Sequence, residues 1–323
     1  MAKNNVELSI CVVSWNCCAK LRECLQSIFL HSQGLIIEVI VVDNASSDNT
    51  IQMVMDEYPQ VRLIRNKTNI GFGRGNNIAI EKCRGKYILL LNPDIVIKKA
   101  CFKELISSIE TLPEAGVVGC RLVNKDGSIQ KSFYKSFPSI MSELYWGLML
   151  HRIKNIMPRY KGDKNQAIKV SWLVGGCMLL RKGVLSQMNG FNIKYFMYGE
   201  DVDLCYRLKK INLKAYYLPN ITMLHYHGVS SKKQKRHYFS AVMQRESVYK
   251  FMLINYGRFT AFLYRCVWIV CGSVRVALCG IGCIAAHLLF KDKSKEVVRC
   301  FEKYMRVLSW GLGFEKWTKR QGI

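Results

Sequence analysis

Four short apolar runs in the first third of the chain each lead through a polar loop into a stretch with helical periodicity. Short runs rich in Val, Ile and Leu are typical of β-strands. Strands that alternate with helices through short loops predict an α/β fold, with a mostly parallel sheet and helices on both of its faces. The four runs are residues 8–13, 36–42, 61–65 and 87–91.

The run at residues 87–91 leads to the first candidate functional residue. It contains no polar alternation, which indicates a strand buried on both faces. Pro93 lacks an N–H group and ends the strand ladder, so Asp94 lies just past the carboxyl end. Ligands of open α/β sheets collect at this edge, where Asp94 is well placed to bind a metal ion or a diphosphate. Asn92-Pro93-Asp94 also has the composition of an ordinary turn, and that alternative stays open here.

Other polar groups follow the neighbouring strands at the same predicted edge. Asp43 follows the second run directly, whereas Asp48 or Thr50 can cap the next helix. A glycine cluster at residues 71–77 follows the third run, and Arg74 with its N–H groups would suit an anion. The cluster is not a dinucleotide fingerprint, because that motif follows the first strand and has a different spacing. A Rossmann oxidoreductase is therefore disfavoured.

A second acidic cluster lies near the middle of the chain. Glu200, Asp201 and Asp203 repel one another, so the fold must supply cations, hydrogen bonds or water. They can simply occupy the first turn of a helix, whose dipole favours anions, or one of them can act as a general base. Gly175-Gly176, inside an apolar run, indicates the close approach of a ligand or another backbone segment.

The composition requires an anionic partner. Lys and Arg number 48 against 23 Asp and Glu, a net charge of +25, which suits nucleic acid, a phosphorylated substrate or anionic lipid. The 14 cysteines form no C-x-x-C pair, and the N-terminus lacks the pattern of a secretion signal. We therefore expect a reducing compartment, with cysteines that act as small buried hydrophobic residues.

The C-terminal region changes in character. A basic run at residues 232–237 precedes the most apolar part of the chain, 259–290, which Arg265 and Arg275 interrupt. Its longest uncharged stretch, 276–290, is shorter than the ~20 residues that span a bilayer. We expect helices that lie in the membrane interface, with the flanking arginines at lipid phosphates. A packed helical cap and a short inserted hairpin are the alternatives.

Taken together, the motifs resemble those of the family 2 inverting glycosyltransferases, which have the GT-A (Rossmann-like) fold. They occur in family order and resemble the branch that contains rhamnosyltransferases. The resemblance implies a catalytic domain at residues 1–231 and a helical, membrane-associated region at 232–323. The motifs are VSWN at 13–16, VVDNASSDNT at 41–50, NKTNIGFGRGNN at 66–77, LLLNPD at 89–94, GEDVDLCYR at 199–207 and HYHGVS at 225–230.

The resemblance also implies roles for individual residues. Asp94 would bind Mg²⁺ or Mn²⁺ together with His225, for which His227 is the alternative. Asp201 would be the general base, oriented by Glu200 and Asp203. The side chains that would bind the nucleotide-sugar donor are Ser14, Asn16, Asp43, Asn69, Arg74, Asn76 and Asn92, the last replacing the first Asp of the family's D-x-D element.

The expected function is the transfer of a sugar, L-rhamnose from dTDP-rhamnose, to a lipid-linked or growing cell-surface glycan. We expect the enzyme at the cytoplasmic face of the membrane, as a peripheral or monotopic protein on anionic lipid. UDP-GlcNAc, UDP-galactose and GDP-mannose are alternative donors. A nucleic-acid-binding protein is the alternative from another class, but carboxylates rather than basic and aromatic residues gather at the loop edge, so we expect no nucleic acid partner.

Overall fold

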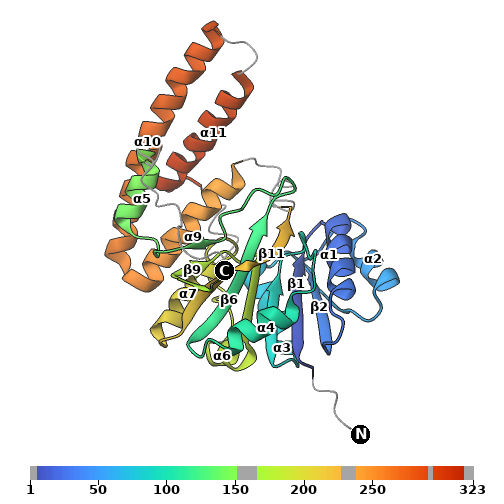
Figure 1. Ribbon diagram of the computed structural model, residues 1–323. Helices are drawn as coiled ribbons and strands as arrows, with labels where there is room; N and C mark the ends of the chain where they lie inside the picture. Colours follow the sequence, from blue (N-terminus) through green and yellow to red (C-terminus); the bar gives the residue numbers. More distant parts are fainter. Residues whose placement is uncertain (1–5, 151–165, 227–237, 290–293, 316–323) are drawn as a thin grey trace. The chain divides into compact units, whose positions relative to one another are not determined.

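The computed structural model describes residues 6–150, 166–226, 238–289 and 294–315. The chain divides into two compact units (Figure 1). Among the described residues, the first unit contains those up to 137 with 166–196 and 200–226, and the second contains the rest. His227 and the basic run at 232–237 lie outside the described residues.

The first unit is built around a nine-stranded sheet whose N-terminal half is parallel. Strand β1 (Leu8–Ser14) lies between β2 (Ile37–Asp43) and β4 (Tyr87–Leu91), and β3 (Arg62–Arg65) pairs with the outer side of β2. The four predicted strands are confirmed, with bounds that differ by a residue at most. The helices that connect them are α1 (Cys18–Leu30), α2 (Thr50–Glu57) and α3 (Phe72–Lys82).

The other half of the sheet mixes strand directions. Strand β10 (Cys177–Arg181) runs antiparallel between β4 and β6 (Ala115–Val123), and β11 (Lys214–His225) runs parallel to β6. Strands β5 (Ile95–Val96) and β8 (Ile168–Val170) pair antiparallel with β11. The sheet is therefore mixed, but β6 and β11 run in the same direction as β1, β2, β3 and β4, so most of its strands agree with the prediction of a mostly parallel sheet and β10, β5 and β8 run the other way. An apolar run predicts a buried strand but contains no information on its direction.

Two parts of this half of the sheet are irregular. The turn after β6 forms, since the Asn124 N–H donates to the Ser128 carbonyl at 2.9 Å, but the returning segment pairs with β6 only at Ile129. The chain then enters a separate two-stranded sheet of β7 (Phe133–Tyr134) and β9 (Trp172–Leu173). Strand β11 is itself irregular, with a shift in its register against β6 between Leu218 and Thr222.

Helices cover both faces of the sheet, as predicted. Leu8, Ile10 and Val12 of β1 join the core under α1, α2 and α4 (Phe102–Glu110). Cys11 and Val13 point to the opposite face and join the core under α3, α6 (Lys182–Gln187) and α7 (Glu200–Lys210). Successive side chains of a strand point to opposite faces, so burial on both explains why β1 is apolar throughout.

In its described residues, the second unit contains four helices and no strand. They are α5 (Ile140–Gly147), α9 (Phe239–Tyr256), α10 (Arg258–Leu289) and α11 (Ser294–Gly311). Helices α10 and α11 lie side by side and antiparallel in Figure 1. A methyl group at Gly272 would lie 3.3 Å from Leu308, and one at Gly280 would lie 3.6 Å from Phe301. Glycine at position 272 therefore lets the two helices approach closely, whereas the contact at position 280 is an ordinary one.

Helix α10 contains a stretch, Arg258–Gly282, that is long and apolar enough to cross a membrane, with a mean hydropathy of 1.6. The sequence analysis expected the arginines of this stretch at the protein surface, but the structure turns them toward other helices. Arg275 is buried and donates to the carbonyl groups of Trp146 and Gly147 in the last turn of α5. Arg265 lies over the ring of Trp310. For Arg275 the prediction that the flanking arginines contact lipid phosphates is therefore wrong, because its guanidinium group is buried and held by protein.

Candidate active site

Asp43 and Ser14 lie beside each other at the carboxyl ends of β2 and β1, where they are paired in the strand register. Both are completely buried. Asp43 Oδ2 accepts a hydrogen bond from the Ser46 N–H at 2.8 Å, but among the described residues Oδ1 has no partner. A buried acceptor without a partner is costly, so a ligand N–H or O–H group that reaches Oδ1 would be bound favourably.

Asn16 and Asp48 connect the loops that follow β1 and β2. Asn16 Oδ1 accepts from the Ser47 N–H at 2.6 Å. Asp48 accepts from the N–H of Thr50 and from the N–H of Cys18, both at 3.2 Å. Asp48 therefore accepts the first N–H of α2, as predicted, although the N-cap position itself is Asn49 and has no side-chain cap, and the same carboxylate also contacts the start of α1. These contacts fix the two loops against each other beside Asp43.

The glycine cluster is a packing element at the start of α3. A methyl group at Gly73 would lie 3.3 Å from Phe191 Cβ and 3.4 Å from Glu200 Cβ, and one at Gly75 would lie 2.9 Å from Val13. The N–H of Phe72 donates to the Phe196 carbonyl at 3.0 Å. The glycines therefore let α3 approach β1 and α7 closely, and the protein itself uses the N–H group at the helix start.

Three predicted donor-binding residues also make local contacts in this segment. Asn69 Oδ1 accepts from the Gly71 N–H at 3.0 Å, where the backbone of Gly71 has φ +90°. Arg74 Nε donates to the Ile193 carbonyl at 3.2 Å. Asn76 is buried and donates to the carbonyl of Phe72 in its own helix. Asn69 and Asn76 thus stabilise the local backbone of the segment, and Arg74 attaches it to the chain at 193.

Asp94 and His225 form the second part of the site. Strand β5 begins directly after Asp94 and pairs antiparallel with the end of β11, where His225 is paired with Ile95. The pairing places His225 Nε2 3.2 Å from Asp94 Oδ1, and both side chains are buried. The two residues that the sequence analysis assigned to the metal site therefore lie together.

Gln130 fixes the orientation of the His225 ring. Its amide nitrogen donates to Asn124 Oδ1 at 2.7 Å and to the His225 carbonyl at 2.8 Å. Its Oε1 is left to accept from His225 Nδ1 at 2.7 Å. In the neutral imidazole the lone pair then lies on Nε2, which faces the Asp94 carboxylate. The sequence analysis missed Gln130, because it belongs to no motif.

This arrangement suits a cation. Among the described residues, no three His, Cys, Asp or Glu side chains cluster closely enough to hold a metal ion alone. Magnesium ions at nucleotide sites are commonly bound by one or two protein ligands together with substrate phosphates. The Asp94 carboxylate and the Nε2 lone pair of His225 are two such ligands, and a hydrogen-bonded partner on the far ring nitrogen is typical of a metal-binding histidine.

Asp201 lies at the start of α7 and is buried. Its Oδ1 accepts from the Val202 N–H at 2.8 Å, and its Oδ2 accepts from the Gly175 N–H at 3.1 Å. Burial raises the pKa of the Asp201 carboxyl above its ordinary value, while these N–H groups act in the opposite direction. A carboxylate with a raised pKa is a stronger proton acceptor, as a general base requires.

The turn at Gly175-Gly176 connects Asp201 with the end of β4. The carbonyl of Gly176 accepts from the Asn92 N–H at 2.9 Å, while the N–H of Gly175 holds the Asp201 carboxylate. The dipeptide Gly175-Gly176 therefore lies between the predicted base, Asp201, and the segment 92–94 that contains Asp94. A methyl group at Gly176 would lie 2.9 Å from the Leu122 side chain, whereas one at Gly175 would lie 3.5 Å from Asp201 Cβ in ordinary contact, so the close approach at this turn is made by Leu122 rather than by a ligand or another backbone segment.

The other two acids of this cluster differ in their surroundings. Asp203 accepts from Arg207 Nε at 2.8 Å and from the Tyr195 hydroxyl at 3.2 Å. Arg207 also donates to the carbonyl groups of Met188 and Gly190. Asp203 therefore helps to anchor α7 to the segment before it. Glu200 is buried, with its Cβ against Gly73.

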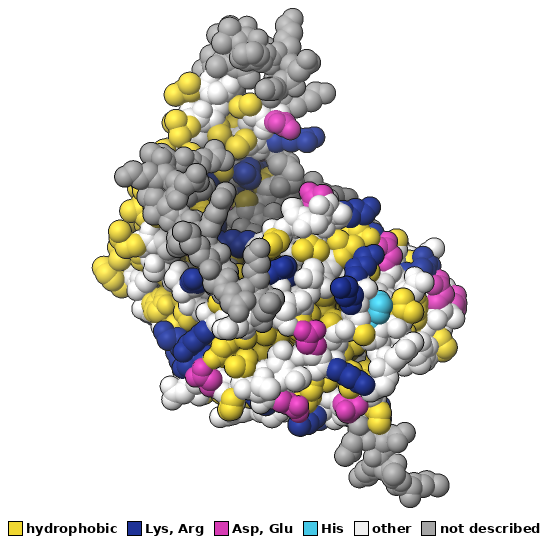
Figure 2. Space-filling model, viewed as in Figure 1, with side chains coloured by type: hydrophobic (Ala, Val, Ile, Leu, Met, Phe, Trp, Pro, Cys, Tyr) yellow, Lys and Arg dark blue, Asp and Glu magenta, His cyan; other side chains and the backbone are white. Residues whose placement is uncertain are grey.

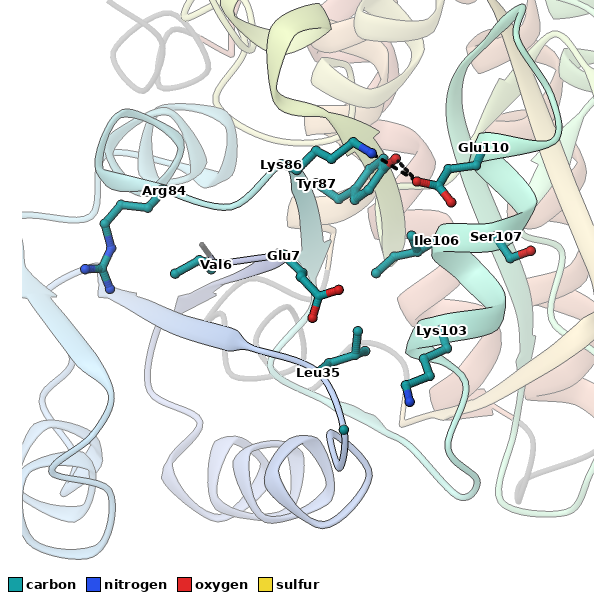
Figure 3. Close-up of a pocket in the computed structure, with 11 residues that line it drawn as sticks. Val6, Glu7, Leu35, Arg84, Lys86, Tyr87, Lys103, Ile106, Ser107 and Glu110 are labelled. Carbon is teal, nitrogen blue, oxygen red and sulfur yellow. Dashed lines mark hydrogen bonds and ion pairs between the residues drawn. The ribbon is translucent and has the colours of Figure 1, made fainter. Parts of the chain in front are cut away.

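A cavity of about 600 Å³ lies elsewhere in the first unit (Figure 3). Its lining includes Glu7 and Tyr87, at the amino ends of β1 and β4, and the Lys86–Glu110 ion pair at 3.1 Å. It contains none of the predicted site residues. Because these residues precede the strands, the cavity lies at the edge of the sheet opposite to Asp43, Asp94 and Asp201.

Comparison with known proteins agrees with this geometry. The family model for glycosyl transferase family 2 matches residues 9–188, and a model described as the N-terminal domain of galactosyltransferase matches 163–229. An N-acetylglucosaminyl-diphospho-decaprenol L-rhamnosyltransferase of Mycobacterium tuberculosis is 30% identical over 247 residues, covering 69% of this chain and 78% of that protein. The rhamnosyltransferase WbbL of Escherichia coli is 31% identical over 196 residues, covering 58% and 72%.

A solved structure shows the same fold. The mannosyltransferase PcManGT of Pyrobaculum calidifontis, in complex with GDP-Man and Mn²⁺, superimposes with a TM-score of 0.55 at 13% identity, covering 95% of this chain and 88% of that one. At this identity the likeness concerns the fold, and it supports the predicted GT-A architecture. The family match and the similar sequences together show that this chain is a glycosyltransferase of family 2, in the branch that contains rhamnosyltransferases.

Proposed function

We propose that this enzyme transfers L-rhamnose from dTDP-rhamnose to a lipid-linked acceptor of a cell-surface glycan, with inversion at the anomeric carbon. The names of the similar proteins support both the sugar and the acceptor class. A single displacement needs one base to activate the acceptor hydroxyl and a site for the leaving nucleoside diphosphate. No second nucleophilic carboxylate is needed.

The observation that carries the proposal is the connection between Asp201 and Asn92 through Gly175-Gly176. It holds a buried carboxylate with a raised pKa next to the end of β4. Asp94 follows that strand and would bind the diphosphate of the donor through a metal ion. Asp201 accepts the proton of the acceptor hydroxyl as the oxygen attacks. Glu200 and Asp203 position it, Asp203 by fixing α7 through Arg207.

Donor recognition is assigned to the carboxyl ends of the parallel strands. Asp43 Oδ1, which has no partner in the described part of the chain, accepts from the nucleobase, with Ser14 and Asn16 beside it. Asn69, Arg74, Asn76 and Asn92 complete the donor site around it. A divalent ion, Mg²⁺ or Mn²⁺, held by Asp94 and His225 would stabilise the negative charge that develops on the leaving diphosphate.

The location follows from the two substrates. A nucleotide sugar is water-soluble and a lipid-linked acceptor is not, so the enzyme must meet both at a membrane surface. We place it at the cytoplasmic face, as a peripheral or monotopic protein on anionic lipid. The apolar stretch in α10 and the net charge of +25 support this placement.

A donor screen tests the proposal. The purified chain is incubated with Mn²⁺, a short-chain lipid diphosphate sugar and, in turn, dTDP-rhamnose, UDP-GlcNAc, UDP-galactose or GDP-mannose. Mass spectrometry should detect a product only with dTDP-rhamnose, and NMR of the product should show the anomeric configuration opposite to that of the donor. A product from another donor alone would refute the sugar assignment, and retention would refute the mechanism.

A further inference from the structure

The outward face of α10 is apolar over most of its length. From residue 259 to residue 281, no exposed residue of this helix carries a charge. Phe259 is 73% exposed, Phe262 61% and Ile281 66%. Figure 2 shows hydrophobic side chains along the outer edge of this helix. The exposed residues recur at spacings that keep them on one face, and they are Phe259, Phe262, Val270, Ser273, Val274, Ala277, Leu278 and Ile281.

The charged residues of the same stretch point to the other side. Arg275 donates to two carbonyl groups of α5 and to the hydroxyl of Tyr304 at 2.8 Å. Arg265 donates to the Trp310 carbonyl at 3.5 Å, and its guanidinium carbon lies 5.1 Å from the ring centre of Tyr249. Both guanidinium groups thus contact other residues of the second unit. The outward face can enter an apolar phase without taking a charge with it.

Helix α11 limits how deeply the pair of helices can enter. It packs along α10 and exposes Glu296, Arg299 and Arg306 on its own outer surface. Charged side chains at the centre of a bilayer are costly, so a helix pair that crosses the membrane would place these residues unfavourably. If α10 lies flat instead, its apolar face enters the lipid while α11 stays at the level of the headgroups or above them.

We propose that the outward face of α10 is the membrane-binding surface of this protein, inserted into the acyl boundary of an anionic bilayer with the helix axis parallel to the membrane plane. This inference rests on the membrane location in the proposed function. Exposed basic residues, among them Arg258 and Arg299, complement anionic headgroups. Insertion of the apolar face supplies binding that salt does not screen.

Vesicle sedimentation tests this surface. The full chain is mixed with phosphatidylcholine vesicles containing one part in four of phosphatidylglycerol, in 0.1 M and 0.5 M NaCl. We expect binding to persist at 0.5 M NaCl and the partition coefficient to fall at least ~10-fold in the double variant Val274→Glu/Leu278→Glu. Phe262→Glu is a second, independent variant of the same face. Met305→Glu, an exposed apolar position on α11, is the matched control and should change binding less than ~2-fold.

Three results would overturn the inference. Loss of all binding at 0.5 M NaCl would mean attachment by charge alone, and wild-type binding by the double variant would mean that another surface enters the lipid. A wild-type dimer that the double variant converts to a monomer, with vesicle binding unchanged, would assign the face to a second copy of the chain. Turnover with a detergent-soluble acceptor is measured in parallel. It should be unchanged in the double variant, so a failed donor screen and a failed vesicle assay are distinguishable.

Discussion

Replacement of Asp201 by Asn tests the proposed base, and the structure shows what else the change would disturb. Both carboxylate oxygens accept hydrogen bonds, one from the Val202 N–H and one from the Gly175 N–H. An amide has only one oxygen, so its NH₂ group must face one of these donors. The variant therefore removes the base and weakens one contact of the Gly175-Gly176 turn.

The two effects differ in size and in what they change. A lost general base lowers turnover by ~10²–10⁴-fold, or about 3–5 kcal/mol in the activation free energy. A buried donor left without its acceptor costs about 1–3 kcal/mol of folding free energy. Turnover of Asp201→Asn should therefore fall by at least ~100-fold, with a modest loss of stability. The affinity for dTDP should be nearly unchanged, because the proposed nucleoside-binding residues Asp43 and Ser14 lie on β2 and β1 and not on α7.

The assay separates these quantities by measuring initial rates, dTDP binding by calorimetry and thermal unfolding on the same samples. Gly175→Ala is the matched control, since its methyl group would lie 3.5 Å from Asp201 Cβ, in ordinary contact, and it keeps the N–H donor. It should retain turnover within a few-fold. If Asp201→Asn keeps more than a tenth of wild-type turnover, another group is the base and the reasoning fails.

Four further predictions follow from the same structure. Asp94→Ala should abolish metal-dependent donor binding, and a wild-type enzyme indifferent to EDTA would contradict the metal assignment. Gln130→Leu should weaken Mn²⁺ binding by ~10–100-fold in a calorimetric titration, because the His225 ring loses its orienting partner. Since burial raises the pKa of Asp201, turnover should fall as the pH drops through that raised value and the carboxylate gains a proton; an acid limb at the ordinary value, ~pH 4, would contradict the burial argument. Arg275→Met should destabilise the second unit by about 3–5 kcal/mol in chemical denaturation, because the carbonyl groups at the end of α5 lose a charged donor.

The positions of the strands could be predicted because a strand that is buried on both faces needs apolar residues at successive positions. Tyr87–Leu91 is apolar at every position, since alternate side chains enter different cores. The residue that follows such a strand is placed at an edge of the sheet by chain geometry alone. Asp43 and Asp94 could therefore be assigned to one edge before any coordinates were known.

Other parts of the site depend on contacts that leave no local pattern. Gln130 acts on His225 across 95 positions of sequence, and nothing in its neighbourhood distinguishes it from a surface glutamine. The arginines of α10 were interpreted as surface residues, because the sequence shows that a charged residue is present but not the direction in which its side chain points. Their partners come from α5, α9 and α11, and only the packing of those helices shows that the charges point inward.

The strand direction that the sequence analysis missed has a consequence for catalysis. Because β10 is antiparallel to β4, its amino end lies at the same edge as the carboxyl ends of β1, β2 and β4. The residues that precede it, Gly175 and Gly176, therefore reach Asn92 and Asp201 directly. A parallel strand in this position would begin at the opposite edge, and its preceding loop would be a strand's length away from Asp94. The antiparallel β10 thus brings the proposed base next to the proposed diphosphate end of the donor site, while the parallel strands β1 and β2 carry the residues proposed for its nucleoside end.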